Sequence, residues 1–280
     1  MTKVLSVGIA TLDTIVLVDK YPKADERVIA KQTLRAVGGP ATTAAVTMAR
    51  LGIDVALSCV IGDDEAGRVI FNRLREEGID TRNVVIDPNV KTAIGTIIVS
   101  ATEKTRAIMV QPHEVLPARP DNLADYAWIH VDHFGMRALK LWGIKRGSGA
   151  KLSIDIGYQS PDFNPGDYDL YAPSENVTLD VSTAKRDNNF VVISKGSEGS
   201  SFSDGIESGE VPALDLEIIS TLGAGDVFHG ALVAAQVWGK SARESVEIAN
   251  TVAGISCRAL DGQTGIPTKA ELAAFLGVRA

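Results

Sequence analysis

The sequence predicts an α/β fold in which a mainly parallel sheet carries helices on both faces and a small second sheet projects from it. The first observation is that short, valine-rich apolar segments alternate along most of the chain with segments of helical periodicity. The second is that two stretches, approximately residues 13–37 and 91–111, interrupt this order with alternating apolar and polar residues. We expect these stretches to pair as a lid, inserted in one domain that spans residues 1–280.

The chain begins with a strand that the pattern predicts to be buried. Residues 3–10 are almost all apolar and rich in valine, as the strands of a covered sheet are. Residues 14–22 and 27–39 alternate apolar and polar side chains, which is typical of half-buried strands. These two segments are therefore assigned to the projecting sheet.

The next segments return to the order of strand and helix. A helix is predicted over residues 39–52, because Pro40 suits its first position and Gly52 its end. A strand follows over 54–62. The helix predicted over 63–78 has acidic residues in its first turn and a glycine at its end, as the helix dipole and the common C-terminal signal favour.

A hairpin then interrupts the order, and the order resumes after it. Residues 92–100 and 106–112 alternate on either side of the polar segment ATEKT, which predicts two paired strands of the lid. A strand over 127–133 and a helix over 136–147 continue the main sheet.

The last part of the chain contains two further strands, an apolar segment and three helices. The strands are predicted over 151–157 and 189–196, the apolar segment covers 213–220, and the helices cover 219–235, 242–260 and 269–277. Between the two strands, residues 160–189 are rich in proline, asparagine and aspartate and show no clear periodicity.

Composition excludes several classes of function. The net charge of the 280 residues is −7, whereas nucleic-acid binding requires clustered lysine and arginine. Cys59 and Cys257 lie in apolar surroundings without metal-ligand spacing and are expected to be buried, reduced thiols. The N-terminus lacks the pattern of a signal peptide and no segment has the apolar length to cross a bilayer, so we expect a cytoplasmic protein with no membrane partner.

The segment ISTLGAGDVFHGALVAA, residues 219–235, places one carboxylate in the first turn of an apolar helix. Unpaired N–H groups at a helix N-terminus favour anions, and Gly223 and Gly225 would let a phosphate approach the backbone. Asp226 would then stand where a base could take a proton from an attacking hydroxyl. It could equally complement the helix dipole, a contribution of about 0.3–1 kcal/mol, and the spacing alone does not choose between these roles.

Four segments resemble one family. STLGAGDVFHGAL resembles the C-terminal signature D-T-x-G-A-G-D of the ribokinase-like (PfkB) carbohydrate kinases, and VGGPATTAAVTMARLG is similar to their Gly-Gly segment with its helix. VVISKGSEG looks like the strand and turn beside their nucleotide, and YAPSENV resembles their N-x-x-E region. The order of these four segments is that of the family. The resemblance implies the three-layer ribokinase-like fold and an ATP-dependent kinase that phosphorylates a hydroxyl of a small sugar.

The resemblance also implies roles for individual residues. Asp226 becomes the general base. The implied anion hole consists of Gly223, Ala224 and Gly225. The residues that fall where the family binds sugar hydroxyls are Asp13, Gly38, Gly39 and Thr43. Asp13 could otherwise be a turn residue at the end of its strand.

A second set of residues falls where the family binds the nucleotide. They are Ser194, Gly196 and Gly199 in the turn, Gly262 and Gly265 in the loop beside the adenine, and Arg106 of the lid. Arg106 resembles an arginine that reaches the ATP phosphates, although an exposed hairpin arginine would fit as well. Glu175 would bind Mg²⁺ through water, since Mg²⁺ retains several of its waters in such sites.

Some residues depart from the family pattern. Ser220 replaces the leading aspartate of the signature, which contributes to a monovalent-cation site in some relatives, so no potassium requirement is expected. Thr43 stands in place of an asparagine that touches the sugar, and Pro40 in place of one found in ketohexose kinases. The motifs are closest to sulfofructose kinase and ketohexokinase-like members, yet the segments AIMVQP and HVDHFG contain no clear Asn and Arg pair that could hold a sulfonate.

Other interpretations follow from the same residues. A non-catalytic regulator that binds sugar or nucleotide on a kinase scaffold would tolerate these departures, and a nucleoside kinase would share the fold. His130, Asp132 and His133 could suggest a metal site, but strand alternation directs His133 away from the other two. We prefer the interpretation that these residues lie at a strand end beside the sugar pocket.

His229 could border the nucleotide, or it could be a buried helix residue that only contributes to packing. We expect a homodimer formed through the lid strands.

Overall fold

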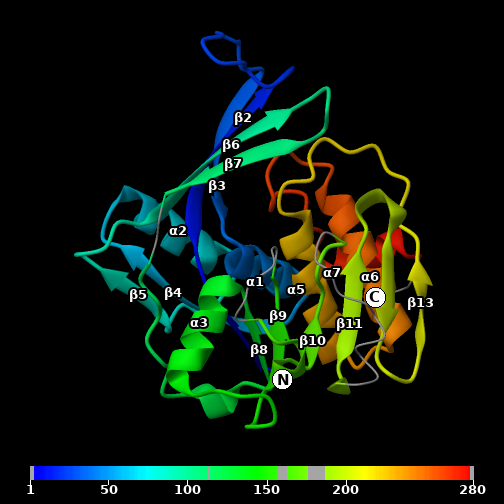
Figure 1. The fold of residues 1–280 in the computed structure, drawn as a ribbon. Coiled ribbons are helices and arrows are strands. Elements are labelled where there is room, and N and C mark those ends of the chain that lie inside the picture. The colour runs from blue at the N-terminus through cyan, green and yellow to red at the C-terminus, as the bar shows by residue number, and fades with distance from the viewer. Residues whose placement is uncertain (1–2, 112–113, 157–162, 176–186, 278–280) are drawn as a thin grey trace.

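The computed structural model describes residues 3–111, 114–156, 163–175 and 187–277. Its body is built on a nine-stranded sheet with the order β13-β12-β11-β10-β9-β8-β1-β4-β5 (Figure 1). The strands are β1 (Lys3–Val7), β4 (Asp54–Gly62), β5 (Val84–Asp87), β8 (Trp128–Val131), β9 (Lys151–Ile154), β10 (Leu170–Tyr171), β11 (Phe190–Ser194), β12 (Ser200–Ser203) and β13 (Ser208–Val211). Pairing is parallel from β5 to β11, and β12 and β13 extend the sheet by antiparallel pairing.

Helices cover both faces of this sheet. They are α1 (Pro40–Arg50), α2 (Glu65–Glu76), α3 (His133–Trp142), α5 (Ala224–Val237), α6 (Ala242–Ser256) and α7 (Lys269–Phe275). Neighbouring residues of β1 belong to separate apolar cores, because successive strand side chains point to opposite faces. Val4 joins the core that contains residues of α1, α5 and α6, and Leu5 joins the core that contains residues of α3. Burial of both faces explains why these strands are almost wholly apolar.

The lid is a separate four-stranded sheet that projects from the body (Figure 1). Its order is β3-β2-β6-β7, formed by β2 (Thr11–Val18), β3 (Gln32–Gly38), β6 (Ala93–Ser100) and β7 (Arg106–Val110). Ile15, Ile97 and Val99 on its inner face form a small core with Leu260 of the body. The lid is therefore held over one edge of the main sheet.

The order of the strands fixes where a ligand can bind. β1 lies between β4 on one side and β8 on the other, so the direction of the chain across the sheet reverses there. Loops diverge at such a point and leave a crevice at the carboxyl ends of the strands. The residues that directly follow β1, β8 and β9 all lie at this edge.

The structure confirms the predicted fold class, and the strand boundaries differ in places. The strand predicted over 27–39 begins only at Gln32, and no strand occurs over 213–220. β5, β10, β12 and β13 were not predicted. α3 begins at His133, three residues earlier than predicted, because Asp132 accepts hydrogen bonds from the first turn of this helix. In the described part of the chain, no helix has the length and apolar character that a membrane span requires.

Candidate active site

A cavity of about 740 Å³ lies between the lid and the carboxyl edge of the main sheet. Its walls come from β2, β6 and β7 of the lid, from the first turns of α1, α3 and α5, from the segments that follow β1, β9 and β10, and from the end of β11. Seven residues predicted for the site line it, namely Asp13, Gly39, Arg106, Ser194, Gly223, Gly225 and Asp226. A cavity of this volume could hold a small molecule together with part of a nucleotide.

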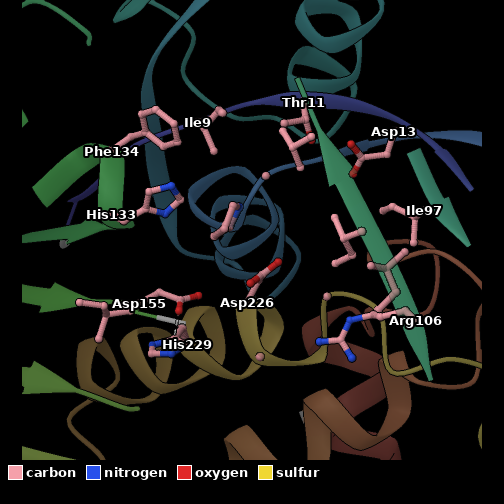
Figure 2. Close-up of a pocket in the computed structure, with 18 of the residues that line it drawn as sticks. Ile9, Thr11, Asp13, Ile97, Arg106, His133, Phe134, Asp155, Asp226 and His229 are labelled. Atoms are coloured by element: carbon pink, nitrogen blue, oxygen red, sulfur yellow. Dashed lines mark ion pairs between the residues drawn. The ribbon is translucent and has the colours of Figure 1, made fainter. Parts of the chain in front are cut away.

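Asp226 reaches the cavity from the first turn of α5 (Figure 2). The helix begins after Gly223, whose φ of 72° is a left-handed conformation that favours glycine. A Cβ on Gly223 would lie 2.8 Å from Cα of Gly262, so the two glycines allow the loops to touch backbone to backbone. Ala224 does not line the cavity with its side chain, and its predicted role involves only its backbone.

Asp155 lies beside Asp226 in the wall of the cavity (Figure 2). It directly follows β9 and is only 8% exposed. Its Oδ1 lies 3.3 Å from Nε2 of His229, and its carboxyl group shares a hydrogen bond with that of Asp226, which lowers the pKa of Asp155 and raises that of Asp226. His229 projects from α5 one turn after Asp226, so this helix supplies both neighbours of Asp155.

The electrostatic environment of this pair is unusual. Burial, with the nearby charge of Asp132, raises the pKa of Asp155 to about 7. Burial also raises the pKa of Asp226 well above its ordinary value; Asp155 adds to this rise, whereas Arg106 opposes it. Burial lowers the pKa of His229 to about 4, so this imidazole is neutral at neutral pH. The cavity thus contains two adjacent acids that cannot both ionise easily.

Asp13 lines the opposite side of the cavity, from the lid strand β2 (Figure 2). Burial raises its pKa, while hydrogen bonds from the Thr11 hydroxyl and the Gly95 backbone oppose this rise. A Cβ on Gly38 would lie 2.1 Å from one oxygen of Asp13, and a Cβ on Gly95 would lie 2.3 Å from the other. The two glycines on the neighbouring strands therefore make room for this carboxylate.

The Gly-Gly segment positions the start of α1. Gly39 is its N-terminal cap, with a φ of 96°, and a Cβ there would lie 2.3 Å from the carbonyl oxygen of Ile9. Thr43 lies one turn further along and does not line the cavity. It is buried, and its hydroxyl accepts a hydrogen bond of 3.3 Å from Nε2 of Gln263. In this structure Thr43 joins α1 to the loop that contains Gly262 and Gly265.

Of the residues predicted to bind the nucleotide, Ser194 and Arg106 line the cavity. Ser194 ends β11 and lines the cavity, and the turn that follows contains Gly196, with a φ of 57°. A Cβ on Gly199 would lie 2.1 Å from the carbonyl oxygen of Val211, and one on Gly265 would lie 2.5 Å from that of Ser256. Gly199 and Gly265 thus permit close packing of their loops and do not themselves line the cavity.

Arg106 connects the lid to the start of α5. Its Nη1 donates a hydrogen bond of 3.0 Å to the hydroxyl of Thr221, directly after Ser220. Ser220 is buried, and its hydroxyl accepts a hydrogen bond from the N–H of Leu222. The guanidinium of Arg106 is therefore held near both the predicted anion hole and Asp226 (Figure 2).

Glu175 is the predicted ligand of Mg²⁺ and lies beside Ser194. Its side chain is exposed, and its backbone N–H donates a hydrogen bond of 3.0 Å to the Ser194 carbonyl. Within the described ranges, no three His, Cys, Asp or Glu side chains gather as a metal site, the region of His130 and Asp132 included. An exposed carboxylate beside the cavity fits a Mg²⁺ that is held mainly by phosphates and water.

Several cavity residues were not predicted from the sequence. They are Ile9, Thr11, Ile97, Ile108, Val110, Gln111, Glu114, His133, Phe134, Arg137, Asp155, Ile156, Ala172, Ser174 and Leu222, while the place of His229 was left open. Asp155 had a usable signal, since it is a carboxylate near the end of the strand predicted over 151–157 in a parallel sheet. His133 lines the cavity because α3, not a strand, begins there.

Comparison with known proteins identifies the family. The model of the "pfkB family carbohydrate kinase" matches residues 1–139 and 173–269. The ribokinase of Bacillus subtilis is 26% identical over 99% of this chain and 100% of its own, and the ATP-dependent ribose-1-phosphate kinase of Halopiger xanaduensis is 27% identical over 100% and 99%. The crystal structure of a ribokinase from Thermotoga maritima shares the fold, with a TM-score of 0.81, 22% identity and 99% coverage of both chains.

These relatives correct one expectation from the motifs. The named relatives are ribokinases and a ribose-1-phosphate kinase, not the sulfofructose kinases and ketohexokinases to which the motifs looked closest. The reason is that the motifs GGPATTAA and DVFHGAL are short, whereas the comparison draws on nearly the whole chain. The matched family model covers most of the sequence, and the protein belongs to the pfkB family of carbohydrate kinases.

Proposed function

We propose that the protein transfers the γ-phosphoryl group of ATP to a hydroxyl of a small sugar, with ribose as the preferred substrate. The observation that carries this proposal is the position of Asp226, in the first turn of α5 and facing a cavity that Asp13 lines from the lid. The ribokinases among the curated relatives support ribose, and the fructokinases among them make a ketohexose the main alternative.

The proposed reaction is an in-line displacement at phosphorus. Asp226 accepts the proton of the sugar hydroxyl while the sugar oxygen forms a bond to the γ-phosphorus. The bond from this phosphorus to the β–γ bridging oxygen breaks, and ADP leaves with that electron pair. The backbone N–H groups of Gly223, Ala224 and Gly225 would bear the charge that develops on the transferred group.

The remaining site residues would position the two substrates. Asp13 would accept hydrogen bonds from sugar hydroxyls, beside the backbone of Gly38 and Gly39. Arg106 would contribute positive charge next to the phosphates, and closure of the lid over the cavity would exclude water. The loops that contain Ser194, Gly196, Gly199, Gly262 and Gly265 would surround the nucleotide, although only Ser194 lines the cavity.

Mg²⁺ would be held by the phosphates of ATP and, through water, by Glu175. When bound, it would neutralise part of the charge on the phosphates. This role requires no cluster of protein ligands, in keeping with the exposed carboxylate of Glu175 beside Ser194.

An assay of ADP release over a panel of acceptors tests the proposed function. The panel contains ribose, ribose 1-phosphate, a ketohexose, a keto-deoxy sugar acid and a nucleoside. We expect ribose to give the highest kcat/KM. Release that is faster with another acceptor would contradict the ribose assignment, a nucleoside pointing to a nucleoside kinase. No release with any acceptor, together with measurable ATP binding, would favour a non-catalytic regulator.

A further inference from the structure

The loop of residues 261–266 lies against the start of α5. Gly223, the residue before this helix, and Gly262 of the loop touch backbone to backbone, since a Cβ on Gly223 would lie 2.8 Å from the Cα of Gly262. The N–H groups proposed to bear the charge of the transferred phosphoryl group begin at Gly223. A displacement of Gly262 would therefore displace the proposed anion hole.

Gln263, the next residue, is fixed both at its backbone and at its side chain, and it is only 3% exposed. Its backbone N–H donates a hydrogen bond of 2.9 Å to Oδ1 of Asp261, and its carbonyl oxygen accepts one of 2.8 Å from Nη1 of Arg50 in α1. Nε2 of its side chain donates a buried hydrogen bond of 3.3 Å to the hydroxyl of Thr43, also in α1. Gln263 thus connects the loop to α1 at two points about two turns apart.

The two connections differ in strength. Besides its bond to Gln263, Arg50 donates a hydrogen bond of 2.9 Å to the carbonyl oxygen of Ile266, and two of 2.9 and 2.7 Å to the carboxylate of Glu77 after α2. Among the described residues, the bond from Gln263 is the only hydrogen bond between the loop and the end of α1 that borders the cavity. The place of the loop beside the cavity therefore depends on this one bond.

Thr43 has its hydroxyl on the side of the loop. It lies one turn after Gly39, where α1 begins at the cavity, and it does not line the cavity itself. The resemblance places Thr43 among the residues that bind the sugar, whereas its side-chain contact in the structure is with the residue next to Gly262. A change at Thr43 is therefore expected to act on the proposed anion hole.

The amide of Gln263 contributes to position more than to stability. Its Oε1 is buried without a hydrogen-bond partner among the described residues, and such an atom lowers the stability of the fold. Methionine has a similar length and no amide, so it removes the unpaired oxygen together with the bond to Thr43. Gln263→Met therefore separates an effect on position from an effect on folding.

We propose that Gln263 is a positioning residue for the phosphoryl transfer, and that its hydrogen bond to Thr43 fixes the anion hole relative to the Gly-Gly segment at the start of α1. The inference rests on the proposed function, because it assumes that the N–H groups from Gly223 to Gly225 bear charge in the reaction. Gln263 does not line the cavity, and no bond to it forms or breaks. It acts through Gly262.

Steady-state kinetics of Gln263→Met and Thr43→Val test this role. We expect kcat to fall about 10- to 100-fold in each variant, because a displaced anion hole stabilises the transition state less. KM for the sugar should stay within about threefold of wild type. The double variant should be no slower than the single variants, since both remove the same hydrogen bond. Thr43→Ser keeps the hydroxyl and should recover most of the kcat lost in Thr43→Val.

Thr47→Val is the matched control. The hydroxyl of Thr47 is buried in the same helix and donates to the backbone carbonyl of Thr43, so its loss does not touch the loop and should leave kcat within about threefold of wild type. A higher KM for the sugar with unchanged kcat in Thr43→Val would overturn the proposal, because Thr43 would then act on the sugar. A folded Gln263→Met with the kcat of wild type would overturn it as well. If Gln263→Met does not fold, the comparison of Thr43→Val with Thr43→Ser decides.

NMR of the full chain, labelled with nitrogen-15 at glycine, tests the proposal without activity. We expect Gln263→Met and Thr43→Val to move the N–H resonances of Gly223 and Gly225, and Thr47→Val to leave them in place. Resonances that stay in place in Thr43→Val would overturn the proposal. If they move as expected while the wild type phosphorylates no acceptor of the panel, the connection from Gln263 to the start of α5 is right and the proposed function is wrong.

Discussion

At the scale of single residues, the cavity depends on glycines that make room for charged groups. Gly38 was predicted to lie where sugar hydroxyls bind, and the structure shows a steric reason for glycine there. Gly38 and Gly95 leave the space that the carboxylate of Asp13 occupies, on the strands at either side of it. The sequence could not reveal this relationship, because the two glycines are far apart in the chain.

Substitution of Gly38 by alanine should displace Asp13. The new Cβ would lie 2.1 Å from Oδ2 of Asp13, and the neighbouring strand leaves this carboxylate little space to move. Loss of a hydrogen bond to a charged group costs about 1.5–3 kcal/mol, so we expect KM for the sugar to rise about 10- to 100-fold with a smaller change in KM for ATP. Gly254→Ala is the control, since its Cβ would meet nothing closer than 3.6 Å. Equal KM values for Gly38→Ala and wild type would contradict this role.

At the scale of elements, one buried carboxylate joins the starts of two helices to the end of a strand. Asp132 is fully buried and accepts hydrogen bonds from the N–H groups of Phe134 and Gly135 in α3. It also accepts them from Ile9, after β1, and from Ala41 in the first turn of α1. The sequence placed Asp132 at a strand end beside the pocket, yet its bonds to residues 9 and 41 depend on tertiary structure.

Removal of this carboxylate should destabilise the protein strongly. Asp132→Ala leaves four buried N–H groups without their acceptor, and we expect the free energy of unfolding to fall by about 3 kcal/mol or more. Ser241→Ala is the matched control, because Ser241 caps α6 at an exposed site and its loss should cost about 1 kcal/mol. Urea denaturation measures both. A loss for Asp132→Ala no larger than that of the control would contradict the account.

The strands show what periodicity can and cannot predict. The lid strands were predicted from alternation, because each has one face against the body or the cavity. Residues 27–31 were included in one of these predicted strands, but they are exposed and belong to no strand, and Ile29 is 90% exposed. β12 and β13, the segments SSFS and SGEV, have too few apolar residues to be recognised. Alternation predicts which residues could form a strand, and only the tertiary structure decides whether a partner is present.

At the scale of the whole molecule, the site is assembled from distant parts of the chain. The Gly-Gly segment and the first turn of α5 were predicted because each carries its pattern in consecutive residues. Asp155, His229 and the cavity residues of α3 were not assigned to the site, because their proximity to Asp226 arises only when β9, α3 and α5 pack together. The local pattern of the sequence predicted Asp226 as the base. The charged groups around Asp226 could be identified only from the three-dimensional structure.

The lid carries exposed apolar residues that do not line the cavity. Met109 of β7 and Ile94 of β6 are 51% and 40% exposed. Exposed apolar residues on a projecting edge strand favour association with a second copy of the chain. We expect sedimentation equilibrium at micromolar concentration to give the mass of a dimer, and Met109→Lys to weaken the association at least about tenfold. A monomeric mass for the wild-type protein would contradict this expectation.

The central claim is that Asp226 is the base of a phosphoryl transfer, and Asp226→Asn tests it most directly. The measurement is kcat for ADP release with saturating ATP and the best acceptor, with folding checked by circular dichroism and ATP affinity by calorimetry. We predict wild-type folding, ATP affinity close to wild type, and a kcat reduced by about 100- to 10,000-fold, because the variant cannot accept the hydroxyl proton. A folded variant that retains kcat within about threefold of wild type would contradict the claim.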